Sequence, residues 1–421
     1  MSVLSVRPHE RNEERQFSAR VVAVILNWNA WPDTIACLES LLASSQVPRR
    51  IVICDNGSAD DSVERIKAWG RGRSDFATFG SAEEALEGPV TSASIVLLAL
   101  PHNGGYAYGN NIGMRYAVER ADAEFVWILN NDTVVERDAL VHMLDVADSH
   151  PGVGMVGAQL LRHDAPDRVQ AMGGGYIIPV LCHDTQLGGG NKATPEMRAP
   201  IPLDHLVGAS LLVRAAALRD VGYIDETYFL YREETDWCIR MRRAGWKLYC
   251  CPSAIVWHKQ SHSIGFKSPL HDYYAVRNML RLVWKFYPIA APTAFLYFAV
   301  RCIAPKLVRL EFARLLAVLH AYSDFFSGVA GRSSHHTDQM LVRSYVAGIG
   351  VRPTWRPSLR AAGIAAALLI SGAALWGDAG RLPAARPPVA ARPAAASHRH
   401  ARTVSLKAPG LTRAVSVRFN P

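Results

Sequence analysis

The chain has 421 residues, 49% of them hydrophobic and 20% charged, which is typical of a globular protein with room for one large enzyme domain. The formal net charge of +9 would suit a nucleic acid, an anionic lipid surface or an anionic substrate. Much of this charge follows Gly377, where Asp378 is the only acidic residue, so it belongs to a tail and not to a groove. The seven cysteines have no C-x-x-C pair and no zinc spacing, and the polar N-terminal residues show no signal-peptide pattern, which predicts reduced thiols in a reducing compartment.

Apolar runs alternate with helical patterns through the first third of the chain. The predicted strands are 21–26, 50–54, 94–98 and 124–129, and the predicted helices are 33–44, 60–69 and 111–120. Strand alternating with helix four times predicts an α/β fold with a doubly wound, mostly parallel sheet and flanking helices. Ligands bind beyond the carboxyl ends of the strands in such sheets, and the polar clusters of this sequence lie at those positions.

The remainder of the chain is less regular. Residues 170–200 are rich in Gly and Pro and predict a loop, whereas 203–260 return to mixed strand and helix. From Tyr273 to about residue 331 the pattern is helical and apolar. The apolar stretch 361–376 is shorter than the ~20 residues of a membrane-spanning helix, and the Ala-, Pro- and Arg-rich end predicts disorder.

Two polar clusters follow the second and third predicted strands. The sequence DNGS at 55–58 offers a carboxylate that can bind a nucleobase or a ribose, although the same residues also form good turns. The Asn- and Gly-rich segment 103–111 leads into a helix, so its backbone amides can bind phosphate and its glycines permit close approach. A flexible loop explains this segment equally well.

A lone carboxylate and a lone histidine are candidates for metal binding. Asp132 follows a strongly apolar strand in the sequence NNDT at 130–133, where it can hold Mg²⁺ or Mn²⁺ on a diphosphate or cap a helix. His258 ends the strand-like sequence VWH. A lone histidine is more often structural, and this one becomes a candidate only because the other clusters need a metal nearby.

Three carboxylates lie within four residues in the sequence EETD at 233–236. Their repulsion can raise the pKa of one of them towards that of a general base. An acidic helix start, favoured by the helix dipole, is the alternative explanation. The G-x-G-x-x-G pattern at 152–157 follows a predicted helix and not a strand, so no dinucleotide site is predicted there.

In this order the clusters resemble the GT-A glycosyltransferases of family 2, most closely their bacterial rhamnosyltransferase-like and galactofuranosyltransferase-like members. The matching sequence segments are VILNWN at 24–29, DNGS at 55–58, NGGYAYGNN at 103–111, LNND at 129–132, GAS at 208–210, YREETDWCIR at 231–240, VWH at 256–258, YY at 273–274 and RN at 277–278. The resemblance covers a GT-A domain (20–290). Composition and pattern predict the rest of the chain as a disordered arm (1–19), an apolar helical extension (291–376) and a disordered basic tail (377–421).

The resemblance also implies roles for individual residues. The nucleotide-sugar-binding residues are Asn29, Asp55, Asn103, Gly105, Asn110, Asn111 and Asn130, the metal ligands are Asp132 and His258, and the catalytic carboxylates are Glu234 and Asp236. Asn130 stands where the D-x-D-like metal motif of the family has its first Asp, so one charged ligand is missing. Glu234 stands where the family has the Asp that acts as base, which leaves the base open between Glu234 and Asp236.

The mechanism implied is inverting, with a divalent metal, Mg²⁺ or Mn²⁺, as cofactor. A base deprotonates an acceptor hydroxyl, which displaces the nucleoside diphosphate in one step without a covalent sugar–enzyme intermediate. The donor implied first is deoxythymidine-diphosphate rhamnose, and next a uridine-diphosphate hexose or galactofuranose. The acceptor would be a cell-envelope or lipid-linked glycan at the cytoplasmic face of a bacterial membrane, with peripheral contact through the apolar helices and the basic tail.

Two alternatives stay open. One is a nucleotide-sugar-binding partner of another transferase that lacks catalysis itself, although the retention of Glu234, Asp236, Asp132 and His258 argues against it. The other is a nucleic-acid binder, which would explain the basic charge. The acidic cluster at 233–236 and the absence of a nucleic-acid motif argue against this second alternative, so no nucleic-acid partner is expected.

Overall fold

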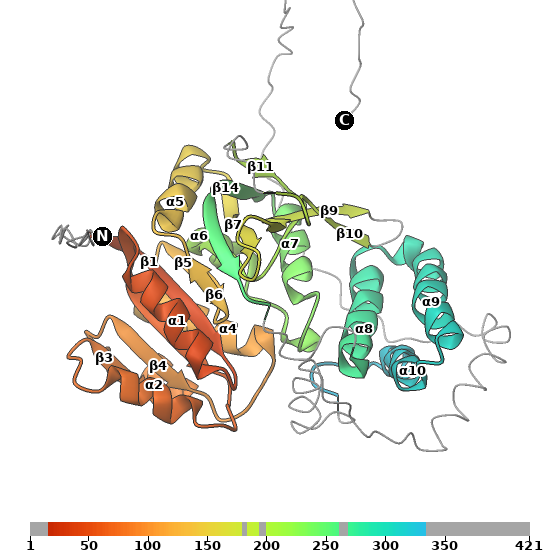
Figure 1. Cartoon of the computed structure of the whole chain (residues 1–421), viewed down its shortest axis with the longest axis horizontal. Helices are drawn as coiled ribbons and strands as arrows, with labels where there is room; N and C mark the ends of the chain where they lie inside the picture. Colours follow the sequence, from red (N-terminus) through yellow and green to blue (C-terminus); the bar gives the residue numbers. More distant parts are fainter. Residues whose placement is uncertain (1–15, 179–182, 193–198, 261–267, 334–421) are drawn as a thin grey trace, which may run out of the picture. The chain divides into compact units, whose positions relative to one another are not determined.

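The computed structural model describes residues 16–178, 183–192, 199–260 and 268–333, and an 11-stranded sheet is the centre of this part of the chain (Figure 1). The main path of the sheet is β11-β14-β7-β13-β5-β1-β2-β4-β3, while β6 pairs with β14 and β8 pairs with β7. Its strands are β1 (Gln16–Asn27), β2 (Gln46–Asp55), β3 (Phe76–Phe79), β4 (Ile95–Ala99), β5 (Phe125–Asn130), β6 (Thr133–Val135), β7 (Val153–Arg162), β8 (Val169–Met172), β11 (Ile201–Pro202), β13 (Ser210–Arg214) and β14 (Lys247–His258).

The pairing of neighbouring strands confirms the predicted α/β class with a mostly parallel sheet. Strand β1 pairs in parallel with β2 and β5, β4 pairs in parallel with β2 and β3, and β14 pairs in parallel with β7. Strand β13 runs antiparallel between β5 and β7. The carboxyl ends of β1, β2 and β5 therefore meet at one edge of the sheet, where the polar clusters begin.

Helices cover both faces of this sheet. The helices are α1 (Trp31–Leu42), α2 (Ser62–Gly70), α3 (Ala82–Glu87), α4 (Tyr106–Arg115), α5 (Ala139–Ser149), α6 (Ala215–Val221), α7 (Glu233–Arg243), α8 (Pro269–Phe286), α9 (Ala291–Val308) and α10 (Phe312–Phe326), with the short turns η1 (Tyr116–Arg120), η2 (Glu226–Tyr228) and η3 (Pro288–Ala290). On β1, Ala23 and Ile25 pack with α1 and α5, whereas Val22 and Val24 pack with α4. A Cβ at Gly113 of α4 would lie 2.4 Å from Val24, so this glycine allows the helix to approach the sheet closely.

The Gly- and Pro-rich segment 170–200 forms strands, and the prediction of a loop there is wrong for its described first half. It contains all but the first residue of β8, together with β9 (Gly174–Ile178) and β10 (His183–Gln186). Strand β9 pairs with β10 and with β12 (His205–Leu206) in a separate 3-stranded sheet. A Cβ at Gly175 would lie 1.6 Å from the Thr185 carbonyl oxygen, so glycine here permits close strand contact and does not mark a loop.

The G-x-G-x-x-G pattern at 152–157 lies at the start of β7. Gly157 pairs with Leu211 of β13, so the pattern is part of a strand and lacks the strand–turn–helix arrangement of a dinucleotide site.

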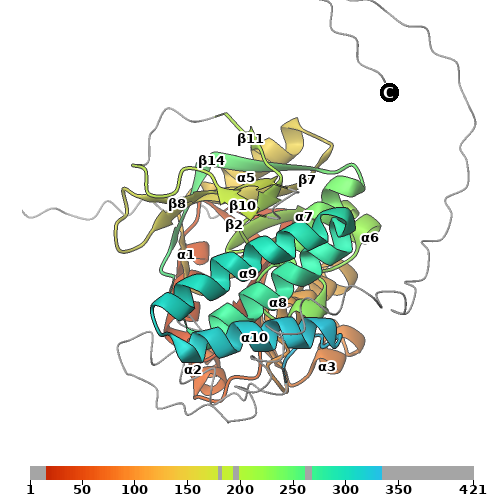
Figure 2. The same cartoon turned by 90° about the vertical axis from the view of Figure 1, so that its right-hand side faces the viewer.

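The helices predicted after Tyr273 are α8, α9 and α10, and they lie side by side (Figures 1 and 2). Helix α8 packs on α7 and α9 through an apolar cluster that includes Ile239, Val283 and Phe298, and on α10 through a second cluster. The segment Pro288–Val308 is long and apolar enough to cross a membrane by length and composition alone, and most of it is not buried. Residues 1–15, the apolar stretch 361–376 and the tail 377–421 lie outside the described residues.

Candidate functional site

Asn29 and Asp55 lie together at the ends of β1 and β2. Asp55 pairs with Asn27 in the sheet register, and its buried carboxylate accepts hydrogen bonds from Asn27 Nδ2 (2.6 Å), Ser58 Oγ (2.6 Å) and the Ser58 amide (3.0 Å). Burial raises the pKa of Asp55, and these hydrogen bonds oppose that effect. Asn29 has a positive φ of 51°, and its Oδ1 accepts from the Ala59 amide (2.7 Å). Both side chains thus shape the turn 56–60 at the sheet edge, and their contact with a nucleoside stays a prediction.

The start of the segment 103–111 contacts the turn that precedes α7. Asn103 Oδ1 accepts from the Gly105 amide (2.9 Å) and from Asn56 Nδ2 (3.1 Å), which fixes the loop against the end of β2. Gly105 has a φ of +91°, and a Cβ there would lie 2.2 Å from the Phe229 carbonyl oxygen. The Tyr106 amide donates to the same oxygen (2.9 Å). Glycine is therefore required at 105 both by its φ and by a backbone contact.

Asn110 and Asn111 are buried in α4 and directed into the protein. Asn111 Nδ2 donates to the Ile224 carbonyl (2.9 Å) and to Glu226 Oε1 (2.8 Å), and its Oδ1 accepts from the Ile224 amide (3.0 Å). Asn110 Nδ2 donates to the Tyr106 carbonyl (3.0 Å), while its buried Oδ1 has no hydrogen-bond partner among the described residues. Asn111 thereby fastens α4 to the segment 224–226, a role that the sequence did not indicate.

Asp132 and His258, far apart in the sequence, form a pair. Strands β6 and β14 align His258 with Thr133, and His258 Nε2 lies 3.1 Å from Asp132 Oδ1. On its other side, His258 Nδ1 lies 3.0 Å from Gln170 Oε1 on β8. With that oxygen as acceptor, Nδ1 carries the hydrogen. In direct contact with Asp132, Nε2 donates to the carboxylate from a protonated ring. A cation bound between Nε2 and the carboxylate would instead take the lone pair of Nε2, with Gln170 as the outer hydrogen-bond partner of a metal-ligating histidine.

These two side chains fit a divalent cation that also binds a substrate diphosphate. No group of three His, Cys, Asp or Glu side chains that could hold a metal occurs in the described part of the chain. Mg²⁺ commonly takes one or two protein carboxylates and completes its shell with phosphate oxygens and water, so a closed protein cage is not required. Asp132 and His258 are therefore suited to a metal whose remaining ligands come with the substrate.

Asp236 is fully buried and is held by charged partners. Its Oδ1 accepts from Arg240 Nε (2.7 Å), and its Oδ2 accepts from Lys285 Nζ (2.6 Å) and the Tyr228 hydroxyl (2.9 Å). Lys285 belongs to α8, so this carboxylate joins α7 to α8. Because both oxygens are occupied and inaccessible, the geometry favours Glu234 over Asp236 as the candidate base.

Glu233 and Glu234 begin α7 in different surroundings. Glu233 is buried, its Oε2 has no hydrogen-bond partner among the described residues, and burial together with the negative charge of Glu234 raises its pKa well above the ordinary range. Glu234 is half-buried, and a Cβ at Gly208 would lie 3.7 Å from its Cβ. The Tyr106 hydroxyl donates to the Gly208 carbonyl (2.7 Å), and burial and the two glutamates raise the pKa of this tyrosine.

The segment 208–209 connects Glu234 to the end of β5. Glu234 lies beside the first residue of this segment, and the carbonyl of the second accepts a hydrogen bond from the backbone amide of Asn130 (3.0 Å). Asn130 is two residues before Asp132, which contacts His258. The structure thus brings the proposed base, the first position of the metal motif and the Asp132–His258 pair to the same edge of the sheet.

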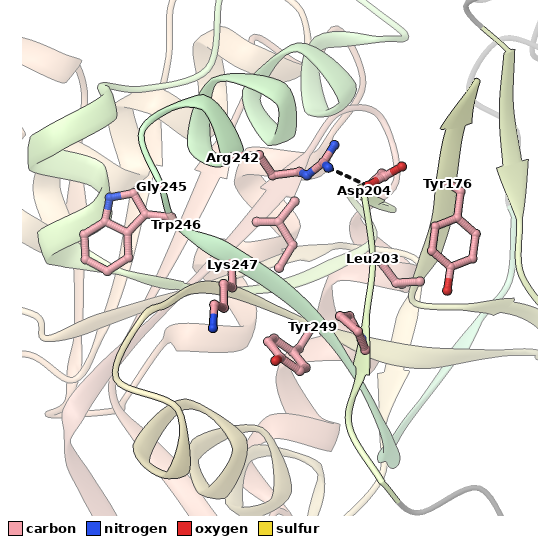
Figure 3. A pocket seen from close by; sticks show the side chains of 10 residues that line it. Tyr176, Leu203, Asp204, Arg242, Gly245, Trp246, Lys247 and Tyr249 are labelled. Atoms are coloured by element: carbon pink, nitrogen blue, oxygen red, sulfur yellow. Dashed lines mark ion pairs between the residues drawn. The ribbon is translucent and has the colours of Figure 1, made fainter. Parts of the chain in front are cut away.

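A separate pocket of about 500 Å³ lies at the C-terminal end of α7, beside β14 (Figure 3). Its lining includes Tyr176, Asp204, Arg242 and Tyr249, and Arg242 forms an ion pair with Asp204 (2.7 Å). None of the predicted site residues lines it, so this pocket is distinct from the candidate site.

Comparison with known proteins gives the family. A sequence model described as "Glycosyltransferase like family 2" matches residues 19–281. The low-salt glycan biosynthesis hexosyltransferase of Haloferax volcanii is 26% identical over 184 residues, which are 42% of this chain and 56% of that protein, so the chain spans little more than half of that relative. N-acetylglucosaminyl-diphospho-decaprenol L-rhamnosyltransferase of Mycobacterium tuberculosis is 26% identical over 260 residues, 58% of this chain and 76% of that protein. The crystal structure of S. aureus TarS 1-349 has a TM-score of 0.45 and 12% identity and covers 78% of this chain and 88% of that chain. The chain belongs to glycosyltransferase family 2.

Proposed function

We propose that the protein transfers a sugar from a nucleoside diphosphate to an acceptor hydroxyl with inversion, and that Glu234 is the general base. The observation that carries the proposal is the placement of Glu234 beside the segment 208–209, at the sheet edge that also holds the Asp132–His258 pair. Asp236, the other candidate, is held by Arg240 and Lys285.

The reaction is a single displacement. The Glu234 carboxylate accepts the proton of an acceptor hydroxyl, and the acceptor oxygen forms a bond to the anomeric carbon while the bond from that carbon to the diphosphate breaks. Attack opposite the leaving group inverts the anomeric configuration. Asp132 and His258 would hold Mg²⁺ or Mn²⁺, which neutralises charge on the leaving diphosphate when bound. The segment 103–106 leads into the N-terminus of α4 and is the candidate for contact with the nucleotide. Its amides at Gly104, Gly105 and Tyr106 donate within the protein, so they hold the shape of this segment.

Rhamnose is the donor sugar that we propose, and a lipid-linked or cell-envelope glycan is the acceptor. The support is the relative in Mycobacterium tuberculosis, whose name states an L-rhamnosyl transfer to a diphospho-decaprenol-linked sugar. A deoxythymidine-diphosphate donor is the first to test, followed by uridine-diphosphate sugars. An acceptor on a lipid requires the enzyme to work at the cytoplasmic surface of a membrane.

The outer face of α9 supports membrane contact. Leu296 (66% exposed) and Val300 (61%) lie four residues apart on one side of α9, and Ile289 (97%) in η3 and Val308 (85%) at the end of α9 are exposed as well. Several large apolar side chains exposed along one helical segment are unusual on a soluble surface. The exposed Arg301 lies in the same helix, as expected for an interfacial helix that contacts anionic lipid headgroups.

The test combines donor binding with sugar transfer. A panel of nucleotide sugars is screened for thermal stabilisation with and without Mn²⁺, because a ligand that binds only the folded state raises Tm. With the donor that binds, Glu234→Gln should keep the thermal shift and lose transfer by about 10²–10⁴-fold, the usual contribution of a general base. Glu233→Gln, one residue away, is the matched control and should retain transfer.

Three results would contradict the proposal. Full activity of Glu234→Gln would show that Glu234 is not the base. Retention of the anomeric configuration in the product would exclude a single displacement. Donor binding by the wild-type protein without transfer to any glycan acceptor would favour a nucleotide-sugar-binding partner of another transferase.

A further inference from the structure

The turn that precedes Glu234 is strained. We call residues 228–232 the base turn, because α7 begins directly after it. Within it Phe229, Tyr231 and Arg232 have positive φ values of 66°, 69° and 77°. Each non-glycine residue in this region costs roughly 1–3 kcal/mol, and such residues persist only where their surroundings fix them. The base turn therefore needs partners that hold its backbone.

Asn278 of α8 is the main partner of this backbone. Its fully buried side chain places Nδ2 near the carbonyl oxygens of Tyr228 (2.8 Å), Leu230 (2.7 Å) and Tyr231 (2.9 Å). An amide has two hydrogens, so these three acceptors share them. Arg277 donates to Asn278 Oδ1 through Nε (3.1 Å), which fixes the orientation of the amide, and to the Tyr228 carbonyl through Nη2 (3.1 Å).

Arg277 is in turn held by groups from its own helix and from the chain at Gly331. Its guanidinium donates to the Tyr273 hydroxyl (3.2 Å) and to the Gly331 carbonyl (2.8 Å), and it lies over the Tyr273 and Tyr274 rings at 5.2 and 5.0 Å. The Tyr273 hydroxyl donates to Asp324 Oδ2 of α10 (2.5 Å). A continuous set of hydrogen bonds therefore runs from α10 through α8 to the base turn.

The base turn is held on its other side by the segment 103–106. The Phe229 carbonyl accepts from the Tyr106 amide (2.9 Å), and Gly105 leaves no space there for a side chain. The turn is thus fixed between the loop that we assign to the nucleotide and the helix that carries Asn278. Displacement of either support would change where α7 begins and where Glu234 points.

We propose that Asn278 is a positioning residue for the base: it holds the base turn in its strained conformation and so fixes Glu234 for proton transfer. This inference rests on the proposed function of Glu234. Asn278 is fully buried and bonds the turn, so its effect on the reaction passes through the backbone. Loss of its amide should lower kcat and leave donor affinity nearly unchanged, since the 103–106 segment keeps its own contacts with Asn56.

The experiment compares Asn278→Ala and Asn278→Asp with Tyr322→Phe. The two Asn278 variants remove the amide donors, and the second keeps the volume of the side chain. Tyr322→Phe is the matched control because it removes one side-chain hydrogen bond to a backbone carbonyl, that of Phe295 (2.9 Å), between the neighbouring helices α10 and α9 and away from the base turn. A displacement of about 1 Å at a reacting group can cost roughly 10²-fold in rate, so kcat of Asn278→Ala should fall by about that factor.

Hydrogen exchange supplies a readout that is independent of catalysis. Amides of residues 229–234 should exchange faster in Asn278→Ala than in the wild-type protein or in Tyr322→Phe, while nucleotide-dependent thermal shifts stay equal. Unchanged exchange in the base turn, or a kcat equal to that of Tyr322→Phe, would overturn the inference. A wild-type protein without transferase activity would instead refute the proposed function, and the exchange data would still report whether Asn278 holds the turn.

Discussion

The substitution Asp236→Asn tests whether the Asp236 carboxylate stabilises the fold or acts as the catalytic base. Asp236→Asn leaves Arg240 and Lys285 without the buried charge that both contact at 2.7 and 2.6 Å. Removing one partner of a buried ion pair lowers the free energy of unfolding by about 3–5 kcal/mol. Lys285 is 39% and Arg240 is 21% exposed, so solvent screens part of the lost attraction, and we expect about 3 kcal/mol. At roughly 2–4 °C per kcal/mol, Tm should fall by about 6–12 °C.

Calorimetry gives Tm, and kcat is measured well below the melting range of the variant. Asp225→Asn is the control, because Asp225 contacts the same Lys285 (2.8 Å) but is partly exposed, so its loss should cost about 1 kcal/mol or less. The reasoning requires Asp236→Asn to be less stable than the control and still able to transfer sugar when folded. A folded, stable and inactive Asp236→Asn would refute it and would make Asp236 the base.

Three further predictions concern other parts of the chain. Burial and the charge of Glu234 raise the pKa of Glu233, so the folded state binds this proton more tightly than the unfolded state. The contribution of Glu233 to stability should be fully present below the unfolded pKa of about 4.3 and be lost as pH rises through the folded pKa. Glu233→Gln should remove this part of the pH dependence of urea unfolding, and an unchanged pH dependence would contradict the prediction. Gln170→Ala should weaken the affinity for Mn²⁺ about 10–100-fold, measured by titration in the presence of the nucleotide, because the Gln170 amide orients His258. An unchanged affinity would show that Gln170 does not support the metal site. Val300→Glu should lower the affinity for anionic vesicles, measured by sedimentation, about tenfold or more, because roughly 1.5–3 kcal/mol of apolar burial is lost. Val90→Glu is the control, since Val90 is similarly exposed (64% against 61% for Val300), and it should leave the affinity unchanged. Equal effects of the two variants would argue against α9 as the membrane contact.

The sheet and the edge that carries the site could be predicted because they follow from local patterns. Residues 21–25 and 125–129 of the predicted apolar runs are buried, and each run is followed by polar residues at the carboxyl end of a parallel strand. Asp55 and Asp132 could be placed at that edge for this reason. Their pairing with Asn27 and His258 depends on which strands are neighbours, and that information is not present in any single segment.

The functions of buried polar side chains could not be predicted, because their partners come from distant elements. Asn111 lies in a motif that suggests nucleotide contact, yet it bonds the backbone of Ile224. The positive φ values of Phe229 and Tyr231 have no sequence signal, since aromatic residues are not turn formers. The sequence RN at 277–278 is part of the resemblance to the family, so a signal for Asn278 did exist. The role of Asn278 could not be predicted, because a buried side-chain amide that contacts three carbonyls has no sequence pattern that distinguishes it from an ordinary helix residue.

The support for the base extends beyond the segment that defines the family. The family match ends at residue 281, but the hydrogen bonds that hold Arg277 reach Asp324 of α10 through Tyr273. Helix α10 would therefore contribute to catalysis without approaching the substrate. Asp324→Asn should lower kcat less than Asn278→Ala, because Asp324 reaches the base turn only through Tyr273 and Arg277, whereas Asn278 bonds the turn directly. In the double variant the two effects should not add, since both loosen the same turn, and additive losses in kcat would show that α10 acts on the reaction by a separate route.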